Sequence, residues 1–509
     1  MVLGVVVALL FVLGVAPLLA ALAALGGAGP EAWSALLGER VLHLLLGTAA
    51  LGVVTALACA VVGVPVGLAL ARRRSRLTGL LALLLPLPLI LPPWVAGLAW
   101  ARMVRLSGFW GAVLLLTLSL WPFVALFALR GFRAAASAGD AAVLARGRRA
   151  AWLSIELPLA LPSILSGMLL VFLFSITDFG VVDFLSFNVP EPFTVLSSEI
   201  FLKWGRLESA PTAAVVSLPA LLLGGMALAG VLALEARHRG RARGLPAGPG
   251  TARRGSAAGT AGLLAVTAVV LLPLGVLCVW ASRHPDPLAT LGDPDIVHDA
   301  LRSVMVAAGA GLAVAVFGVA AARASLRLSA RGESLLLLLA LLPLAAPGVL
   351  FAVGEIQLWN APWNPLADSI YRSPLLLVMA TAGRFLCLGL LAARALLARQ
   401  DPGPLEAARL SGRSWPVRWA RIELPLLAPA IGLACALGYL FSLRELDIPS
   451  LVPAGNATLV RRIYGLVHIS SDDQTALLSL LLVALVLVPL VAARLLGVPG
   501  VDCGPPRER

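Results

Sequence analysis

Long apolar runs dominate this chain and constrain its fold more than any other feature. A bilayer-spanning helix needs about 20 consecutive apolar residues, and about twelve runs meet that length. They lie near residues 2–26, 42–70, 79–101, 111–129, 159–179, 211–234, 263–282, 301–322, 334–354, 375–393, 426–443 and 475–493. Only 13% of the 509 residues are charged, about half the share in a soluble domain. The sequence therefore predicts an all-α integral membrane protein with about twelve transmembrane helices.

The charged residues indicate how the helices are oriented. Most arginines fall in loops that share one face of the membrane, whereas the opposite loops carry acids such as Asp286, Asp293 and Asp472. This is the positive-inside pattern, which predicts a multi-pass protein of the cell (inner) membrane with both termini cytoplasmic. The net charge of +13 is then explained by topology, and no nucleic-acid partner is expected. The first run lacks a basic region before it, so we expect a retained helix rather than a cleaved signal.

The two halves of the sequence repeat each other. An Arg-, Gly- and Pro-rich stretch at 237–262 predicts a cytoplasmic linker between two transmembrane halves, 1–236 and 263–509. The run Ile-Glu-Leu-Pro-Leu occurs at 155–159 and again at 422–426. Each half has about six helices, which predicts parallel repeats related by an axis along the membrane normal, with a pathway between them.

A polar segment interrupts the apolar runs of the second half. Glu406, Ala407 and Ala408 begin a short helix. Gly412 supplies a residue able to adopt the positive φ that ends a helix, and Pro425 is suited to the start of the next one. We expect a helix–turn–helix across the inner face of the membrane. The alternative for any Arg-rich loop is an amphipathic helix lying on lipid headgroups.

The spacing of this segment closely resembles the EAA loop of ABC-importer permeases. The Gly stands six residues after the Glu, and the Leu-Pro pair ends thirteen residues after the Gly. The resemblance implies that the loop docks on a separate ATP-binding subunit, two of which would serve the two halves. It also implies an extracytoplasmic substrate-binding protein. The chain itself has no G-x-x-x-x-G-K-[ST] phosphate loop, so we expect a non-enzymatic subunit without catalytic residues, metal site or cofactor.

The corresponding loop of the first half departs from that pattern. The residues Asp140, Ala141 and Ala142, with Gly147, recover the residue types but not the spacing to Pro158. A docking loop is still expected there, with altered contact chemistry.

Over nearly its whole length the chain is similar to fused two-permease proteins of ferric-iron uptake systems, with thiamine permeases as a related branch. The segments that carry this likeness are Ile176–Gly180, Gly383–Arg394 and Leu459–His468. The resemblance implies an iron(III)-type substrate, with thiamine or another import substrate as the alternative. An ion-driven twelve-helix transporter is a second alternative. A membrane enzyme is less favoured, because the sequence shows no cluster of His, Asp or Cys.

Five residues are candidates for the translocation pathway. Asp178 and Glu445 each follow the Leu-Pro proline by twenty residues. That is a rise of about 30 Å in a helix, which places them near its outer end. Ser175 and Ser442 precede them by three residues, and Arg384 lies in another predicted helix. The acids would receive a cation on the central axis. Alternatively, they are solvated at the membrane boundary, or Arg384 pairs with one of them.

Overall fold

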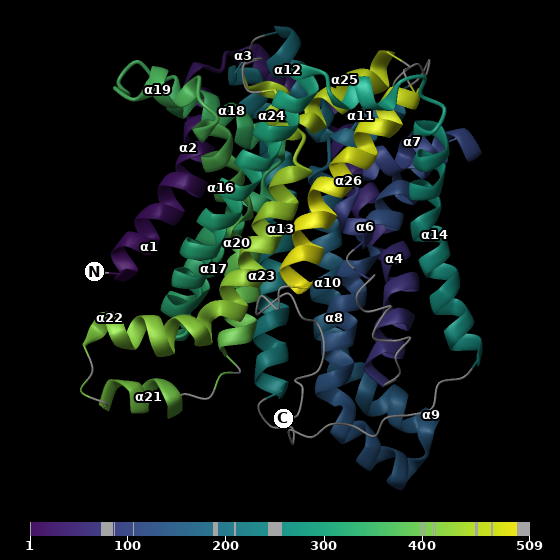
Figure 1. Cartoon of the computed structure of the whole chain (residues 1–509), viewed down its shortest axis with the longest axis vertical. Coiled ribbons are helices and arrows are strands. Elements are labelled where there is room, and N and C mark those ends of the chain that lie inside the picture. Colours follow the sequence, from purple (N-terminus) through teal and green to yellow (C-terminus); the bar gives the residue numbers. More distant parts are fainter. Residues whose placement is uncertain are drawn as a thin grey trace. The chain divides into compact units, whose positions relative to one another are not determined.

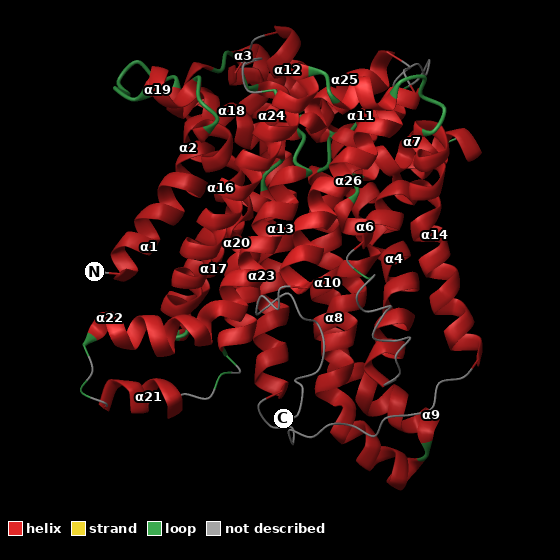
Figure 2. Cartoon of the chain, viewed as in Figure 1, coloured by secondary structure: helices red, strands yellow, loops and turns green. Residues whose placement is uncertain are grey.

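The computed structural model describes residues 2–495, apart from 73–84, 86, 105, 187–191, 208–209, 243–256, 399, 401–402, 411, 413, 453–456 and 470–471. Within these ranges every regular element is a helix (Figure 2). Among the described helices, nine are long and apolar enough to cross a membrane, or ten if one bent pair counts as a span. The chain is an all-α integral membrane protein, and the predicted number of twelve spans is not confirmed.

Three predicted runs account for the difference. The run 79–101 lies partly outside the described residues and continues as α6 (Leu87–Ile90) and α7 (Pro93–Met103). The run 263–282 belongs to α14 (Ala257–Ala281), in which only the stretch Thr267–Ala281 counts as an apolar helix, too short to be a candidate span. The run 334–354 is broken into α17 (Ala330–Ala345) and α18 (Gly348–Trp359), bent by 101°. Pro347 lies at this break, where it lacks an N–H and disfavours helical geometry in the residue before it.

The chain forms two compact units that do not coincide with the two halves of the sequence. Unit 1 contains Met1–Ala23, Arg283–Leu344 and Phe351–Arg509, and unit 2 contains Ala24–Ser282 and Ala345–Leu350. The first helix thus belongs with helices of the second half, and α14 belongs with those of the first. The predicted linker 237–262 starts inside a helix and ends inside α14, and its middle, 243–256, lies outside the described residues.

Unit 1 is built around three long helices, α16 (Pro294–Ser325), α20 (Leu375–Leu397) and α23 (Leu424–Leu443). Small buried residues, Ala315, Ala322, Ala393, Ala430 and Ala434, line their contact and let the backbones approach closely, as membrane helices require. The other elements are α1 (Val2–Leu10), η1 (Phe11–Val15), α2 (Ala16–Ala23), α15 (Pro287–Leu291), α19 (Ala367–Tyr371), α21 (Gly403–Leu410), α22 (Trp415–Arg418), η4 (Trp419–Glu423), α24 (Asp447–Leu451), α25 (Leu459–Ile469) and α26 (Asp472–Leu495).

The first helix joins unit 1 through glycines that bring backbones into contact. A Cβ on Gly383 would clash with the carbonyl oxygen of Leu13, and one on Gly354 would clash with that of Pro17. Any larger side chain at these two positions would separate the helices.

Unit 2 repeats the three-helix core with α4 (Glu39–Arg72), α8 (Gly108–Arg146) and α10 (Leu157–Thr177). A Cβ on Gly67 of α4 would lie 2.6 Å from the carbonyl oxygen of Ala125 in α8, so this crossing also depends on a small residue. The remaining elements are η2 (Ala24–Gly27), α3 (Pro30–Leu36), α9 (Arg148–Ala151), η3 (Trp152–Glu156), α11 (Gly180–Ser186), α12 (Leu196–Leu207) and α13 (Ala210–Ala242), besides α6, α7 and α14.

Candidate functional site

The predicted docking segment of unit 1 is a helix–turn–helix made by α21, α22 and η4. It lies at the end of unit 1 opposite to α19 and α25 (Figure 1). Glu406 and Ala407 are exposed on α21, which also contains Ala408. Gly412 has φ +64°, a conformation that residues with a side chain rarely adopt. The positive φ predicted for Gly412 is therefore confirmed.

The docking segment of unit 1 has exposed side chains, both polar and apolar, that no described part of the chain covers. Leu410, at the end of α21, is 88% exposed, and Trp419, at the start of η4, is also exposed. Single exposed apolar residues are ordinary, but here they adjoin the exposed motif. The segment is held at its base by Gln400, whose Nε2 donates to the carbonyl oxygen of Leu426 over 2.6 Å.

The docking segment of unit 2 has the same order of parts but a different start. α8 continues without a break through Asp140, Ala141 and Ala142 to Arg146, and their side chains lie outside the described part of the structure. Gly147 then ends the helix with φ +78° and ψ 165°, and α9 and η3 follow. This end of unit 2 lies opposite to α3 and α12 (Figure 1). Pro158 and Pro425 occupy the second positions of α10 and α23, as the spacing predicts.

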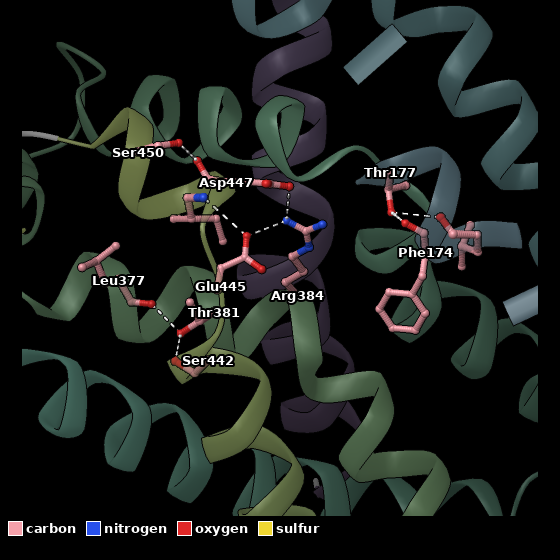
Figure 3. A network of polar contacts seen from close by, with 11 residues as sticks. Phe174, Thr177, Leu377, Thr381, Arg384, Ser442, Glu445, Asp447 and Ser450 are labelled. Carbon is pink, nitrogen blue, oxygen red and sulfur yellow. Dashed lines mark hydrogen bonds and ion pairs between the residues drawn. The ribbon is translucent and has the colours of Figure 1, made fainter. Parts of the chain in front are cut away.

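Two of the pathway candidates meet in a buried ionic cluster of unit 1 (Figure 3). Arg384 Nη1 lies 2.9 Å from Glu445 Oε1 and 3.3 Å from Asp447 Oδ2. The side chains of Arg384 and Glu445 are 7% and 8% exposed, and that of Asp447 is 11% exposed. Charges at this depth are stable only when paired. The pairing of Arg384 with Glu445, foreseen as one of the alternatives, is what the structure shows.

Glu445 also fixes the backbone that follows it. Its Oε1 accepts the N–H of Ile448 over 3.4 Å at the start of α24. Asp178 of unit 2 has the same local role, because its Oδ1 accepts the N–H of Val181 over 2.8 Å in α11. The two acids that the sequence repeat aligned therefore each cap a short helix, and Asp178 is less buried than Glu445.

The two candidate serines differ in their contacts. Ser442 donates to the hydroxyl of Thr381 over 3.1 Å, and Thr381 donates to the carbonyl oxygen of Leu377 (Figure 3). Ser175 donates instead to Val171 within its own helix. The structure therefore places Ser442, Glu445 and Arg384 in one region of unit 1, with Ser175 and Asp178 in unit 2.

A small cavity adjoins this region of unit 1. Its lining includes Ser303, Thr381, Ser442, Glu445 and Thr458. The centre of a water molecule can occupy about 10 Å³ of it, which is room for about one water molecule. In this conformation the cavity cannot admit a hydrated ion.

Sequence reasoning missed three acids. Asp447 shares Arg384 with Glu445, and its position two residues after Glu445 could have indicated this. Glu156 and Glu423 are the glutamates of the repeated Ile-Glu-Leu-Pro-Leu run, and both are buried. Their exact recurrence in a run of otherwise apolar residues was the signal that could have found them.

An all-helical protein with many membrane spans and a polar loop of this geometry has the architecture of a transport permease. No family model matches the chain. The molybdenum transport system permease protein ModB of Mycobacterium tuberculosis is 29% identical over 191 residues, which cover 34% of this chain and 72% of the relative. The ModB of Azotobacter vinelandii is 29% identical over 224 residues, covering 40% and 96%.

A third relative is the molybdate/tungstate transport system permease protein WtpB of Thermococcus kodakarensis. It is 30% identical over 168 residues, covering 32% of this chain and 67% of the relative. The chain belongs to the family of ABC-importer permeases.

Proposed function

We propose that this chain is the membrane subunit of an ATP-driven importer and carries two permease halves in one polypeptide. The observation that carries the proposal is the pair of helix–glycine–helix segments, each with a positive φ at its glycine and each leading into a Leu-Pro helix start. Family membership adds support, since each of the relatives above matches between 32% and 40% of this chain. That is the length expected if one half corresponds to one ordinary permease.

Two ATP-binding subunits are the proposed partners of the two segments, and a substrate-binding protein is the proposed partner at the other face. ATP would favour one conformation of the complex by binding it more tightly, which shifts the population between inward- and outward-facing states. In the docking segment of unit 1, the exposed residues Glu406 and Ala407 are the proposed contacts with the ATP-binding subunit. In the docking segment of unit 2, Asp140 is the proposed counterpart, with a weaker contact.

The proposed substrate class is a small inorganic ion. The relatives are named for molybdenum, or for molybdate and tungstate, so an oxyanion of this type is the first substrate to test. Ferric iron, expected from the sequence alone, and thiamine, its alternative, find no support among these relatives. One observation supports testing a cation as well, because two acids, Glu445 and Asp447, share Arg384.

The test is ATP-dependent uptake in vesicles that contain the chain with its ATP-binding subunit and binding protein. Molybdate, tungstate, ferric iron and thiamine are supplied separately, and both uptake and ATP hydrolysis are measured. We expect one of the inorganic ions to stimulate ATP hydrolysis and to accumulate. Uptake that requires an ion gradient and ignores ATP would instead establish the secondary-transporter alternative.

Topology is tested by single cysteines in a cysteine-free background. Ala407→Cys in the docking segment should react with an impermeant thiol reagent only in inverted vesicles. Leu288→Cys, at a position 82% exposed in α15, should react only from outside intact cells. Reaction of Ala407→Cys from outside would overturn the cytoplasmic assignment of the segment.

A further inference from the structure

Both units contain a π-helical turn at the same place in the repeat. η3 (Trp152–Glu156) and η4 (Trp419–Glu423) each directly precede the Leu-Pro pair. The N–H of Leu157 bonds to the carbonyl oxygen of Trp152, and that of Leu424 to Trp419. These are the wider, i to i+5 bonds of a π turn, which are rare and often lie at functional sites.

The proline of each Leu-Pro pair explains the widened turn. Pro158 and Pro425 have no N–H to donate to the carbonyl four residues earlier, and their rings would clash with it in a regular α-helix. A wider turn relieves that clash. The position of the turn is therefore set by the sequence in both units.

Each π turn ends on a buried glutamate. Glu156 is 6% exposed and Glu423 is 8% exposed. Glu156 forms an ion pair with Arg72, the last residue of α4. The Oε2 atom of Glu423 lies 2.9 Å from Arg323 Nη2, one helical turn or less from the end of α16.

The two pairs join equivalent elements. In each unit a glutamate of the docking segment is bound by an arginine at the end of the long helix that contributes to the three-helix core. The pair in unit 1 is reinforced, because Arg418 of α22 also approaches Glu423, with Nε 3.3 Å from Oε1. A buried carboxylate that loses its arginine is left uncompensated, so segment and helix end resist separation.

We propose that Glu156 and Glu423 are positioning residues that transmit movement of the docking segments to α4 and α16. This inference rests on the proposed function. When an ATP-binding subunit displaces a docking segment, the ion pair obliges the end of the long helix to follow rather than letting the segment bend at its π turn. The residues touch neither ATP nor the transported substrate, and they act through Arg72 and Arg323.

The experiment compares Glu423→Gln with a matched control, Glu333→Gln, in the assembled transporter. Glu333 of α17 also pairs with an arginine, Arg394 of α20, but it lies outside the docking segment. Measured quantities are co-purification with the ATP-binding subunit, ATP hydrolysis, and substrate transported per ATP hydrolysed. The last ratio reports transmission, which loss of folding alone would not change in the molecules that remain assembled.

We expect Glu423→Gln to keep its ATP-binding subunit and its basal ATP hydrolysis but to transport at least about fivefold less substrate per ATP, an effect equivalent to roughly 1 kcal/mol. Glu333→Gln should leave the ratio unchanged. Glu156→Gln, with Glu235→Gln as its control because Glu235 pairs with Arg130 outside the segment, should show the same pattern with a smaller loss.

Exchange of the charges gives a second, independent arm. The double variant Glu423→Arg with Arg323→Glu should recover part of the lost ratio if the pair itself carries the movement. An unchanged ratio in assembled Glu423→Gln, or no recovery in an assembled double variant, would overturn the inference. If the wild type shows no ATP-dependent uptake at all, the proposed function fails instead, so the two failures are distinguishable.

Discussion

The docking segments of the two units are alike from the glycine onward and differ in the residues that precede it. Both have a positive-φ glycine, a short helix, a π turn and a buried glutamate bound by an arginine of the core. They differ in what precedes the glycine, because unit 2 extends α8 as one helix of 39 residues whereas unit 1 starts a separate helix, α21. In the shared part, Glu156 and Glu423 are buried against their own helices, whereas Glu406 and Ala407 in the variable part of unit 1 are exposed.

The first prediction concerns the variable part and has the largest expected effect. Glu406→Lys should abolish substrate-stimulated ATP hydrolysis, because it reverses the charge of an exposed side chain in the motif that we propose as the contact with the ATP-binding subunit. Asp140→Lys should reduce it by only about twofold, equivalent to a few tenths of a kcal/mol, since that copy departs from the spacing of the motif. The measurement is ATP hydrolysis by the reconstituted complex with and without substrate.

Glu31→Lys is the control for that comparison, because Glu31 is an exposed acid in the first turn of α3, outside the docking segments. It should behave as the wild type. Normal coupling in Glu406→Lys would favour the headgroup-binding alternative, and equal losses at both positions would show that the two segments dock alike.

How much the sequence could predict depended on the kind of signal. Apolar length located the long helices well, so that the runs 42–70 and 301–322 lie inside α4 and α16. The turn at Gly412 followed from spacing. The break before α18 was missed because proline is tolerated in many membrane helices, and only packing decides whether it bends one. The placement of residues 1–23 in unit 1 was also beyond the sequence, since a Leu- and Ala-rich helix fits many partners equally well.

The second prediction compares Glu445, which is bound by Arg384, with Asp178, the acid that the sequence repeat aligns with it. Arg384→Met leaves two buried carboxylates without their arginine, which should destabilise unit 1 by about 3–5 kcal/mol. Asp178→Asn should cost about 1 kcal/mol or less, because an amide oxygen can also accept the N–H of Val181. Thermal unfolding in detergent measures both. Similar losses would mean that the two acids hold their units together in the same way.

The same residues sharpen the question of the pathway. The double variant Asp178→Asn with Glu445→Gln is assayed for uptake and for ATP hydrolysis. Loss of uptake with hydrolysis retained would support a pathway role. Full uptake would leave Glu445 as part of a structural cluster and Asp178 as a helix cap.

The third prediction concerns a contact that the two units share. Thr48 Oγ1 accepts the N–H of Leu196 over 3.0 Å in unit 2, and Ser303 Oγ accepts that of Leu459 over 2.8 Å in unit 1. Thr48→Val and Ser303→Ala each leave a buried N–H without its acceptor. Both should destabilise by about 1–3 kcal/mol, by similar amounts.

Ser166→Ala is the control for these two variants. The hydroxyl of Ser166 is buried and donates to a carbonyl oxygen of its own helix, so its removal should cost less, about 1 kcal/mol. A loss of stability in Thr48→Val but not in Ser303→Ala would show that the two hydrogen bonds contribute differently to stability although their geometry is similar.

The last prediction concerns the two glycines, where the expected loss is confined to the local turn. A Cβ at Gly412 or Gly147 would meet nothing within 4 Å, so any cost must come from the backbone. Alanine at either position should therefore destabilise the local turn by about 1–2 kcal/mol. Hydrogen exchange of α21 and α9 measures the loss.

Asparagine separates the two glycines. The φ of +64° at Gly412 is that of the left-handed region, which asparagine enters more readily than other residues. Gly147 combines φ +78° with ψ 165°, a region that only glycine occupies freely. Gly412→Asn should thus protect α21 better than Gly412→Ala does, whereas Gly147→Asn should be no better than Gly147→Ala. Equal behaviour of asparagine and alanine at Gly412 would mean that its turn leaves the left-handed region in the working protein. The two segments would then differ in their turns as well as in their outer helices.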